Sequence, residues 1–284
     1  MNNLLIQGIR WIPFLFFLPF LYLLGWILVQ PLYLLPVTFE VSDISLLGTI
    51  CTFILFLVSL PNWIKIRWKK KEPWHELGLI QSATRAWIKD FVRGFSFALF
   101  LILVLLIFFS IGSWITWVGE FSLNNILNAI LLTFGVGFAE ELIFRGWLWG
   151  EIKFLIGARW SLYIQAAIFS AAHIRFELGF FEQASLLLGL FFLGLLLGLR
   201  RIIDKGSLVG CIGLHGGLVG TWFLINSGLI NLSSTAPSWL AGPGDATPNP
   251  IGGIVAICSI SLILWHQRMA FAIGGFPCNG ERKA

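Results

Sequence analysis

Residues 135–150 read GVGFAEELIFRGWLWG, a run in which two adjacent acids and an arginine interrupt an apolar, aromatic stretch. An ionised side chain at bilayer depth is costly unless it is paired or hydrated. Residues four apart share a helix face, so Glu141 lies above Arg145 and Glu140 points to another side. We therefore expect Glu141 and Arg145 to form a structural ion pair that leaves Glu140 free for chemistry. The alternative is a Glu140 that is merely protonated or hydrogen-bonded to a neighbouring helix.

The composition around this stretch is that of a polytopic membrane protein. The 284 residues are 57% hydrophobic and 12% charged, with a mean hydropathy of +0.87. This length suits about eight spans of about 20 residues each. We expect an all-α polytopic transmembrane helix bundle that forms a single integral membrane domain over residues 1–284. The four cysteines stand singly and predict neither a disulfide framework nor a paired-cysteine metal site.

Apolar runs divide the chain into these predicted spans: about 11–29, 46–60, 95–118, 126–149, 161–173, 184–199, 208–230 and 252–265. Residues 74–93 predict an amphipathic segment on the membrane surface. Residues 231–250, rich in Ser, Pro, Gly and Thr, predict a loop without regular structure.

The basic residues predict the orientation of this bundle. When the cationic stretch at residues 64–72 is placed in the cytoplasm, 18 of the 19 Lys and Arg residues lie inside and only Arg175 lies outside. We expect an integral membrane protein of the cell (inner) membrane with both termini cytoplasmic. This distribution assigns the net charge of +5 to membrane topology, so membrane lipid is the expected partner and nucleic acid is not. The sequence predicts no particular oligomeric state.

Two histidines lie within predicted spans, His173 in IFSAAHIRF and His215 in CIGLHGGLVG. At about 1.5 Å per residue from the cytoplasmic ends, Glu140 lies about 15 Å deep, His173 about 20 Å and His215 about 12 Å. Because one helical turn is about 5 Å, these levels overlap, as a shared site requires. The alternative is that both histidines are ordinary interhelical hydrogen-bonding groups. The glycines around His215 predict either tight helix packing or a substrate cleft.

These residues resemble a known family. Glu140-Glu141-x-x-x-Arg145, Phe169-x-x-x-His173 and a third-motif histidine at His215 are similar to the motifs of the CAAX prenyl protease type 2 and bacteriocin-processing family, also called the abortive-infection family. Its members are intramembrane glutamic endopeptidases. The resemblance covers about residues 135–221 and implies a catalytic core at about 124–230.

The resemblance also implies a role for each matching residue. Glu140 would be the general base that activates water, His173 would hold that water, and His215 would stabilise the oxyanion. Glu141 and Arg145 would fix the helix that carries Glu140, and Phe169 would pack one turn from His173. The expected activity is hydrolysis of a peptide bond in a membrane-associated, in some members lipidated, peptide or protein. No cofactor and no metal are implied.

One position departs from the family pattern. The third motif usually has Asn or Asp four residues after its histidine, and here that position is Val219, whose side chain donates no hydrogen bond. Either His215 acts with another donor such as Thr221, or the oxyanion site is weakened. Val219 therefore favours an alternative function, a non-catalytic membrane scaffold or immunity protein of the same fold.

Three other chemistries stay open at this point. A glutamate and two histidines are also ligands for Zn²⁺, although the HExxH spacing of zinc peptidases is absent. Cys211 lies one turn before His215, but no cationic neighbour in its span activates a thiol. An acid with two histidines would also suit a proton-coupled transporter, although no internal repeat supports that class.

Overall fold

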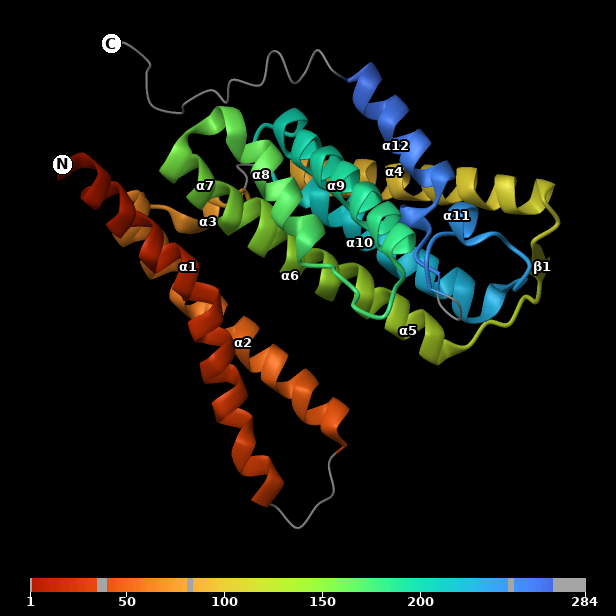
Figure 1. The fold of residues 1–284 in the computed structure, drawn as a ribbon, viewed down its shortest axis with the longest axis horizontal. Helices are drawn as coiled ribbons and strands as arrows, with labels where there is room; N and C mark the ends of the chain where they lie inside the picture. Colours follow the sequence, from red (N-terminus) through yellow and green to blue (C-terminus); the bar gives the residue numbers. More distant parts are fainter. Residues whose placement is uncertain (1, 35–39, 81–83, 245–247, 268–284) are drawn as a thin grey trace. The chain divides into compact units, whose positions relative to one another are not determined.

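A computed structural model describes residues 2–34, 40–80, 84–244 and 248–267. Helices dominate the fold, and six of them are long and apolar enough to cross a membrane: Arg10–Leu34, Val41–Trp68, Ala86–Ile111, Leu123–Ile156, Phe180–Ile203 and Val209–Leu229. These helices confirm the predicted all-α polytopic membrane bundle. The chain divides into two compact units, Met1–Glu76 and Leu77–Ala284 (Figure 1).

The first unit is a hairpin of two long helices. Its elements are α1 (Asn2–Val29), η1 (Gln30–Leu34), α2 (Val41–Trp63), η2 (Ile64–Trp68) and the short α3 (Pro73–Glu76). The helices are antiparallel, since Phe17 stacks on Trp63 at 4.0 Å and Gly25 lies against Thr52 near the other end. Apolar and aromatic side chains therefore hold this hairpin together.

The second unit contains the remaining elements. They are α4 (Thr84–Ile111), β1 (Ile115–Trp117), α5 (Leu123–Leu131), η3 (Leu132–Val136), α6 (Gly137–Glu141), η4 (Leu142–Leu148), α7 (Trp149–Ile156), α8 (Ala158–Ala171), α9 (Phe180–Ile203), α10 (Val209–Leu224), η5 (Ile225–Leu229), β2 (Ile230–Leu232), α11 (Ser238–Ala241), η6 (Pro250–Gly252) and α12 (Ile254–His266). From α5 to α7 the helix is continuous, and η3 and η4 are stretches of wider π-helical turns.

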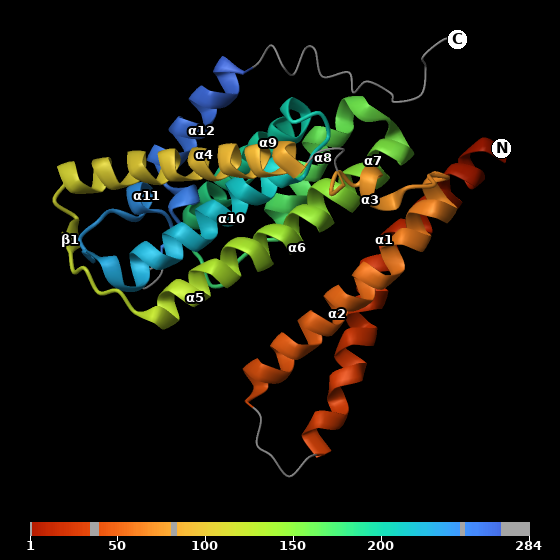
Figure 2. The same cartoon turned by 180° about the vertical axis from the view of Figure 1, so that it is seen from behind.

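Helix α10 lies at the centre of the second unit, packed against α4, α6 and α9 (Figure 2). Its glycines allow neighbouring backbones to come very close. A Cβ atom on Gly216 would lie 1.9 Å from the carbonyl oxygen of Thr133, and one on Gly94 of α4 would lie 2.0 Å from that of Gly210. Of the two alternatives for these glycines, the structure supports tight helix packing.

Two of the predicted spans correspond to shorter helices. Helix α8, at the predicted span 161–173, has 14 residues, and α12, at 252–265, has 13. At 1.5 Å per residue each is about 20 Å long, which is less than the roughly 30 Å of a bilayer's hydrocarbon core. The count of about eight is thus made of six long helices and two short ones.

The boundaries between predicted elements also differ from the structure. Residues 84–93 are the first turns of α4, so the expected surface segment over 74–93 is not a single amphipathic helix. Residues 115–117, expected at the end of a span, form β1, which pairs antiparallel with β2 inside the expected irregular loop. The β-branched and aromatic residues of Ile115–Trp117 favour this extended conformation. The single-domain expectation over 1–284 stays a prediction, because compactness alone does not show which parts fold together.

Candidate functional site

Three predicted site residues from separate elements converge on one point in the second unit. The Oε2 atom of Glu140, on α6, lies 3.5 Å from Nε2 of His173, in the turn after α8. The same oxygen lies 3.8 Å from Nε2 of His215, on α10. Both distances are longer than an ordinary direct hydrogen bond, so the three groups converge without a short hydrogen bond between them.

Each imidazole is oriented by a hydrogen bond at its other nitrogen. Nδ1 of His173 donates to the carbonyl oxygen of Phe169 at 2.7 Å, and Nδ1 of His215 donates to Oε1 of Glu141 at 2.7 Å. Because carbonyl and carboxylate oxygens only accept, both Nδ1 atoms carry a proton. The other nitrogen of each ring, Nε2, faces Glu140; it accepts a hydrogen bond when the ring is neutral and donates one when the ring is doubly protonated.

A buried ionic cluster adjoins these three residues. Glu141 and Arg145 have no exposed surface, and Arg145 Nη1 donates to Glu141 Oε1 at 2.8 Å. This is the ion pair expected from their spacing of four residues. The same oxygen also accepts the His215 bond, so Glu141 joins the ion pair to the histidine. The sequence reasoning missed this second contact, because no local pattern links residues 74 positions apart.

Phe169 lies at the centre of the aromatic contacts in the site. Its buried ring has the Arg145 guanidinium 4.0 Å from its centroid, in cation–π geometry. The ring is also 4.7 Å from the His173 ring and 5.7 Å from the His215 ring. Its packing role was expected; in addition its ring contacts the arginine and both histidines, and its carbonyl orients His173.

Wider helical turns follow the acidic pair directly. In η4 the N–H of Trp149 bonds to the carbonyl of Phe144, five residues back, instead of the α-helical four. Such π-helical turns occur frequently at functional sites. Wider turns also change which residues share a helix face: residues five apart lie closer to the same face than they do in an α-helix. The sequence carries no recognisable signal for this widening.

Glu140 is the accessible member of the cluster. Its side chain is 28% exposed, whereas the side chains of Glu141 and Arg145 are fully buried. Within the residues that the structure describes, Glu140 Oε2 accepts no hydrogen bond of ordinary geometry. The Glu140 side chain is therefore partly exposed, whereas its Oε2 atom, which faces both histidines, is itself buried.

The alternative chemistries gain no further support from this geometry. Among the described residues, no group of three or more His, Cys, Asp or Glu side chains is arranged to hold a metal ion. Cys211 is fully buried, and its Sγ donates to the Leu197 carbonyl. Val219 is half-buried on α10, one turn beyond His215, and its side chain supplies no hydrogen-bond donor.

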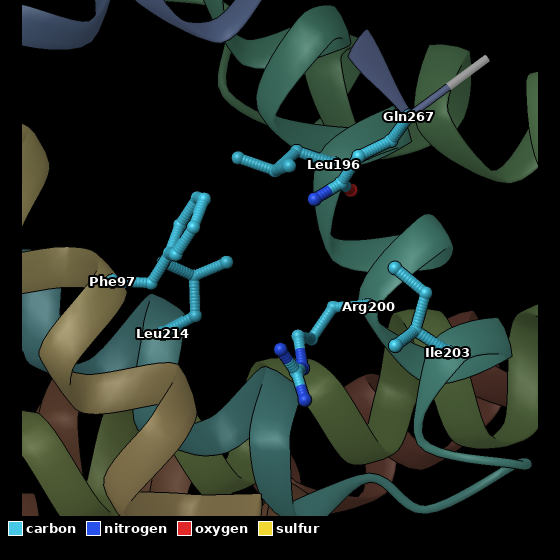
Figure 3. A pocket seen from close by; sticks show the side chains of 6 residues that line it. All are labelled: Phe97, Leu196, Arg200, Ile203, Leu214 and Gln267. Atoms are coloured by element: carbon cyan, nitrogen blue, oxygen red, sulfur yellow. The ribbon is translucent and has the colours of Figure 1, made fainter. Parts of the chain in front are cut away.

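A small cavity elsewhere in the second unit is separate from this cluster. It has a volume of about 20 Å³, enough for about one water molecule. Its lining, from α4, α9, α10 and the end of α12, is Phe97, Leu196, Arg200, Ile203, Leu214 and Gln267 (Figure 3). None of the predicted site residues lines it.

Comparison with known proteins gives two family matches. Residues 122–220 match the family described as type II CAAX prenyl endopeptidase Rce1-like. Residues 2–72 match a domain of unknown function (DUF8676). Neither the curated proteins nor the solved structures give a match. The first matched stretch contains Glu140, Glu141, Arg145, Phe169, His173 and His215. The chain is therefore an integral membrane protein that carries, at residues 122–220, a domain of the CAAX prenyl protease type 2 family.

Proposed function

We propose that this protein is an intramembrane glutamic endopeptidase in which Glu140 activates a water molecule to hydrolyse a peptide bond. The observation that carries the proposal is the approach of Oε2 of Glu140, a buried atom on a partly exposed side chain, to the Nε2 atoms of His173 and His215, at 3.5 and 3.8 Å. A general base must lie within reach of the proton that it abstracts, directly or through one water. A water molecule that binds Glu140 beside the two histidines would meet that requirement.

The proposed reaction begins with this water. Glu140 takes one of its protons while His173 Nε2 accepts a hydrogen bond from the other, and the water oxygen attacks the carbonyl carbon of the substrate. The C=O double bond becomes a single bond to an oxyanion. When the tetrahedral intermediate collapses, the C–N bond breaks and Glu140 returns its proton to the leaving amine. The acid and the amine products therefore carry the atoms of the consumed water.

We assign the oxyanion to His215. In its doubly protonated form this ring donates from Nε2 to the oxyanion, while its Nδ1 proton stays bonded to Glu141. The Glu141 carboxylate balances the charge of that ring, and Arg145 balances the charge of Glu141. A donor that is already oriented in a site with little water contributes a few kcal/mol to catalysis. The buried cluster thus supports chemistry and not helix packing alone.

The proposal needs no metal or cofactor, and it places the substrate in the membrane. We propose a membrane-associated peptide or protein, including lipidated ones, as substrate. We also propose that the protein lies in the cell (inner) membrane with both termini cytoplasmic, on the basis of its basic residues. Three of these, Arg268, Arg282 and Lys283, lie outside the residues that the structure describes.

The test is cleavage of a membrane-peptide library by the purified protein in lipid. Glu140→Gln keeps the size of the side chain but removes the base, and should lower the rate about 10²- to 10⁴-fold. The matched control is Glu177→Gln, which changes an exposed carboxylate in the connection that follows His173, and it should cleave at the wild-type rate. Cleavage by Glu140→Gln at the wild-type rate would exclude Glu140 as the base. Loss of wild-type activity with a chelator would replace the metal-free mechanism with a zinc mechanism.

Val219 favours a second candidate, a non-catalytic membrane scaffold or immunity protein with the same fold. The same library distinguishes the two. A wild-type protein that is folded in lipid but cleaves nothing in the library supports the scaffold, and cleavage that depends on Glu140 excludes it.

A further inference from the structure

The widened helical turn in η4 leaves one backbone carbonyl without its α-helical donor. In an α-helix the N–H of Trp149 would bond to the carbonyl of Arg145, but here it bonds to that of Phe144. The Arg145 carbonyl instead accepts a hydrogen bond from Nη1 of Arg201, on α9. A side chain from a separate helix therefore occupies the position that the wider turn opens.

Arg201 is a buried arginine, 7% exposed, that bonds to three separate segments of the second unit. Besides the Arg145 carbonyl, it donates from Nε to the Gly206 carbonyl at 3.1 Å and from Nη2 to the Leu77 carbonyl at 3.2 Å. Its guanidinium also lies 5.6 Å from the Trp149 ring centroid. A guanidinium has five donors in a planar fork, so one side chain can hold three carbonyls in fixed directions.

These contacts connect the two helices that carry the proposed catalytic groups. Arg145 follows Glu140 by five residues on one continuous helix, and Gly206 lies in the turn just before α10, which carries His215. Movement of the widened turn would shift both Glu140 and Glu141 relative to His215. We propose that Arg201 is a positioning residue, which holds this turn at the spacing that the site requires. The inference rests on the proposed peptidase function.

The neighbouring Arg200 provides a matched control. It is also nearly buried on α9, but it bonds to Asp204, four residues later on the chain. Its side chain points into the small cavity, among Phe97, Leu214 and Ile203 (Figure 3). It forms no hydrogen bond to the helix that carries Glu140, as far as the described residues show. The two arginines thus differ mainly in the segment that each one holds.

The experiment compares Arg201→Lys with Arg200→Lys in the full-length protein, on the folded fraction in lipid. Lysine keeps the charge but is a single compact donor group that replaces a planar fork. We expect Arg201→Lys to lower kcat about 10- to 100-fold, because small displacements of catalytic groups have effects of this size. KM should stay within about twofold, because substrate binding is not the interaction that is lost. Arg200→Lys should keep kcat within about twofold, whatever its effect on thermal stability.

A second measurement does not depend on cleavage. Amide hydrogen exchange over residues 142–150 should be faster in Arg201→Lys than in the wild type, and unchanged in Arg200→Lys. Unchanged exchange, or an unchanged kcat, in Arg201→Lys would overturn the inference. If Arg201→Lys does not fold, Arg201→Gln, which keeps an N–H donor on a shorter neutral chain, is measured by the same criteria.

The two proposals fail in different ways. Absence of cleavage by the wild type would remove the peptidase function, and with it the catalytic part of this inference. Faster exchange in Arg201→Lys would then still support the hold of Arg201 on the helix. Cleavage by the wild type together with a fully active Arg201→Lys would remove only the positioning role.

Discussion

The two units of this protein both contain apolar helices long enough to span a membrane, but they bury very different residues. The two helices of the first unit have mean hydropathies of 2.3 and 2.2, and 22% of each span is buried. In the second unit Phe180–Ile203 and Val209–Leu229 have values of 2.1 and 1.3 with 61% of each buried. Its other two spans, Ala86–Ile111 and Leu123–Ile156, are 33% and 28% buried. All the buried charged side chains among the described residues lie in the second unit: Glu141, Arg145, Glu151, Arg200, Arg201 and Asp204. Hydropathy therefore identifies spans in both units, whereas buried charge identifies the site in only one.

The largest predicted difference between the two units is the loss of stability when an ion pair is broken. Glu141→Ala leaves Arg145 and His215 without their shared partner in a fully buried position, and should lower the free energy of unfolding by about 3–5 kcal/mol. Glu76→Ala in the first unit breaks the Lys70–Glu76 pair, whose side chains are 43% and 34% exposed, and should lower it by about 1 kcal/mol or less. Folded yield and thermal unfolding in detergent measure both changes.

Equal stability losses in these two variants would contradict the distinction between the units. An unchanged unfolding temperature in Glu141→Ala alone would show that the buried ion pair contributes no net stability. Glu141→Gln separates charge from shape, because its amide still accepts the His215 bond but no longer neutralises Arg145. The free energy of unfolding of Glu141→Gln should lie between those of the wild type and Glu141→Ala.

A smaller difference between the units is the change in stability when a helix glycine is replaced by alanine. Gly216→Ala places a Cβ atom 1.9 Å from the Thr133 carbonyl oxygen, so α10 must move, at a cost of about 1–3 kcal/mol. In the first unit the nearest atom to a Cβ on Gly48 is a Val29 methyl carbon at 3.4 Å. Gly48→Ala should therefore be neutral or stabilise the helix by up to about 1 kcal/mol. The thermal unfolding temperature should fall in Gly216→Ala and should stay the same or rise in Gly48→Ala. An unchanged unfolding temperature in Gly216→Ala would refute the close approach of α10 to the Thr133 carbonyl.

The sequence predicts the membrane fold well because apolar runs determine where helices can span a bilayer. It predicts the spacing of Glu141 and Arg145 because a contact over four residues is local and depends only on helix geometry. The sequence groups Glu140 with His173 and His215 through approximate depths and the family resemblance. Depths specify a level in the membrane but not a direction around each helix.

The features that the sequence did not predict depend on contacts between distant segments. The His215–Glu141 hydrogen bond and the hold of Arg201 on the Arg145 carbonyl join residues 74 and 56 positions apart. The widened turn that makes the second contact available has no sequence pattern of its own. The run at 161–173, which forms α8, is already too short in the sequence for a full crossing, whereas the short α12 is not distinguished from a full span, because hydropathy does not reveal where a helix ends.

The smallest predicted effect tests whether the proposed oxyanion site lacks a hydrogen-bond donor at Val219. Val219→Asn adds a donor one turn after His215, at the position where the family pattern has Asn or Asp. If the oxyanion site is short of one donor, kcat should rise about tenfold, which is about 1.4 kcal/mol of transition-state stabilisation. Val219→Leu changes the side chain without adding a donor, and should leave kcat unchanged or lower. Kinetics on one cleaved peptide measure both variants, and an equal response to Asn and Leu would mean that another group, such as Thr221, already stabilises the oxyanion.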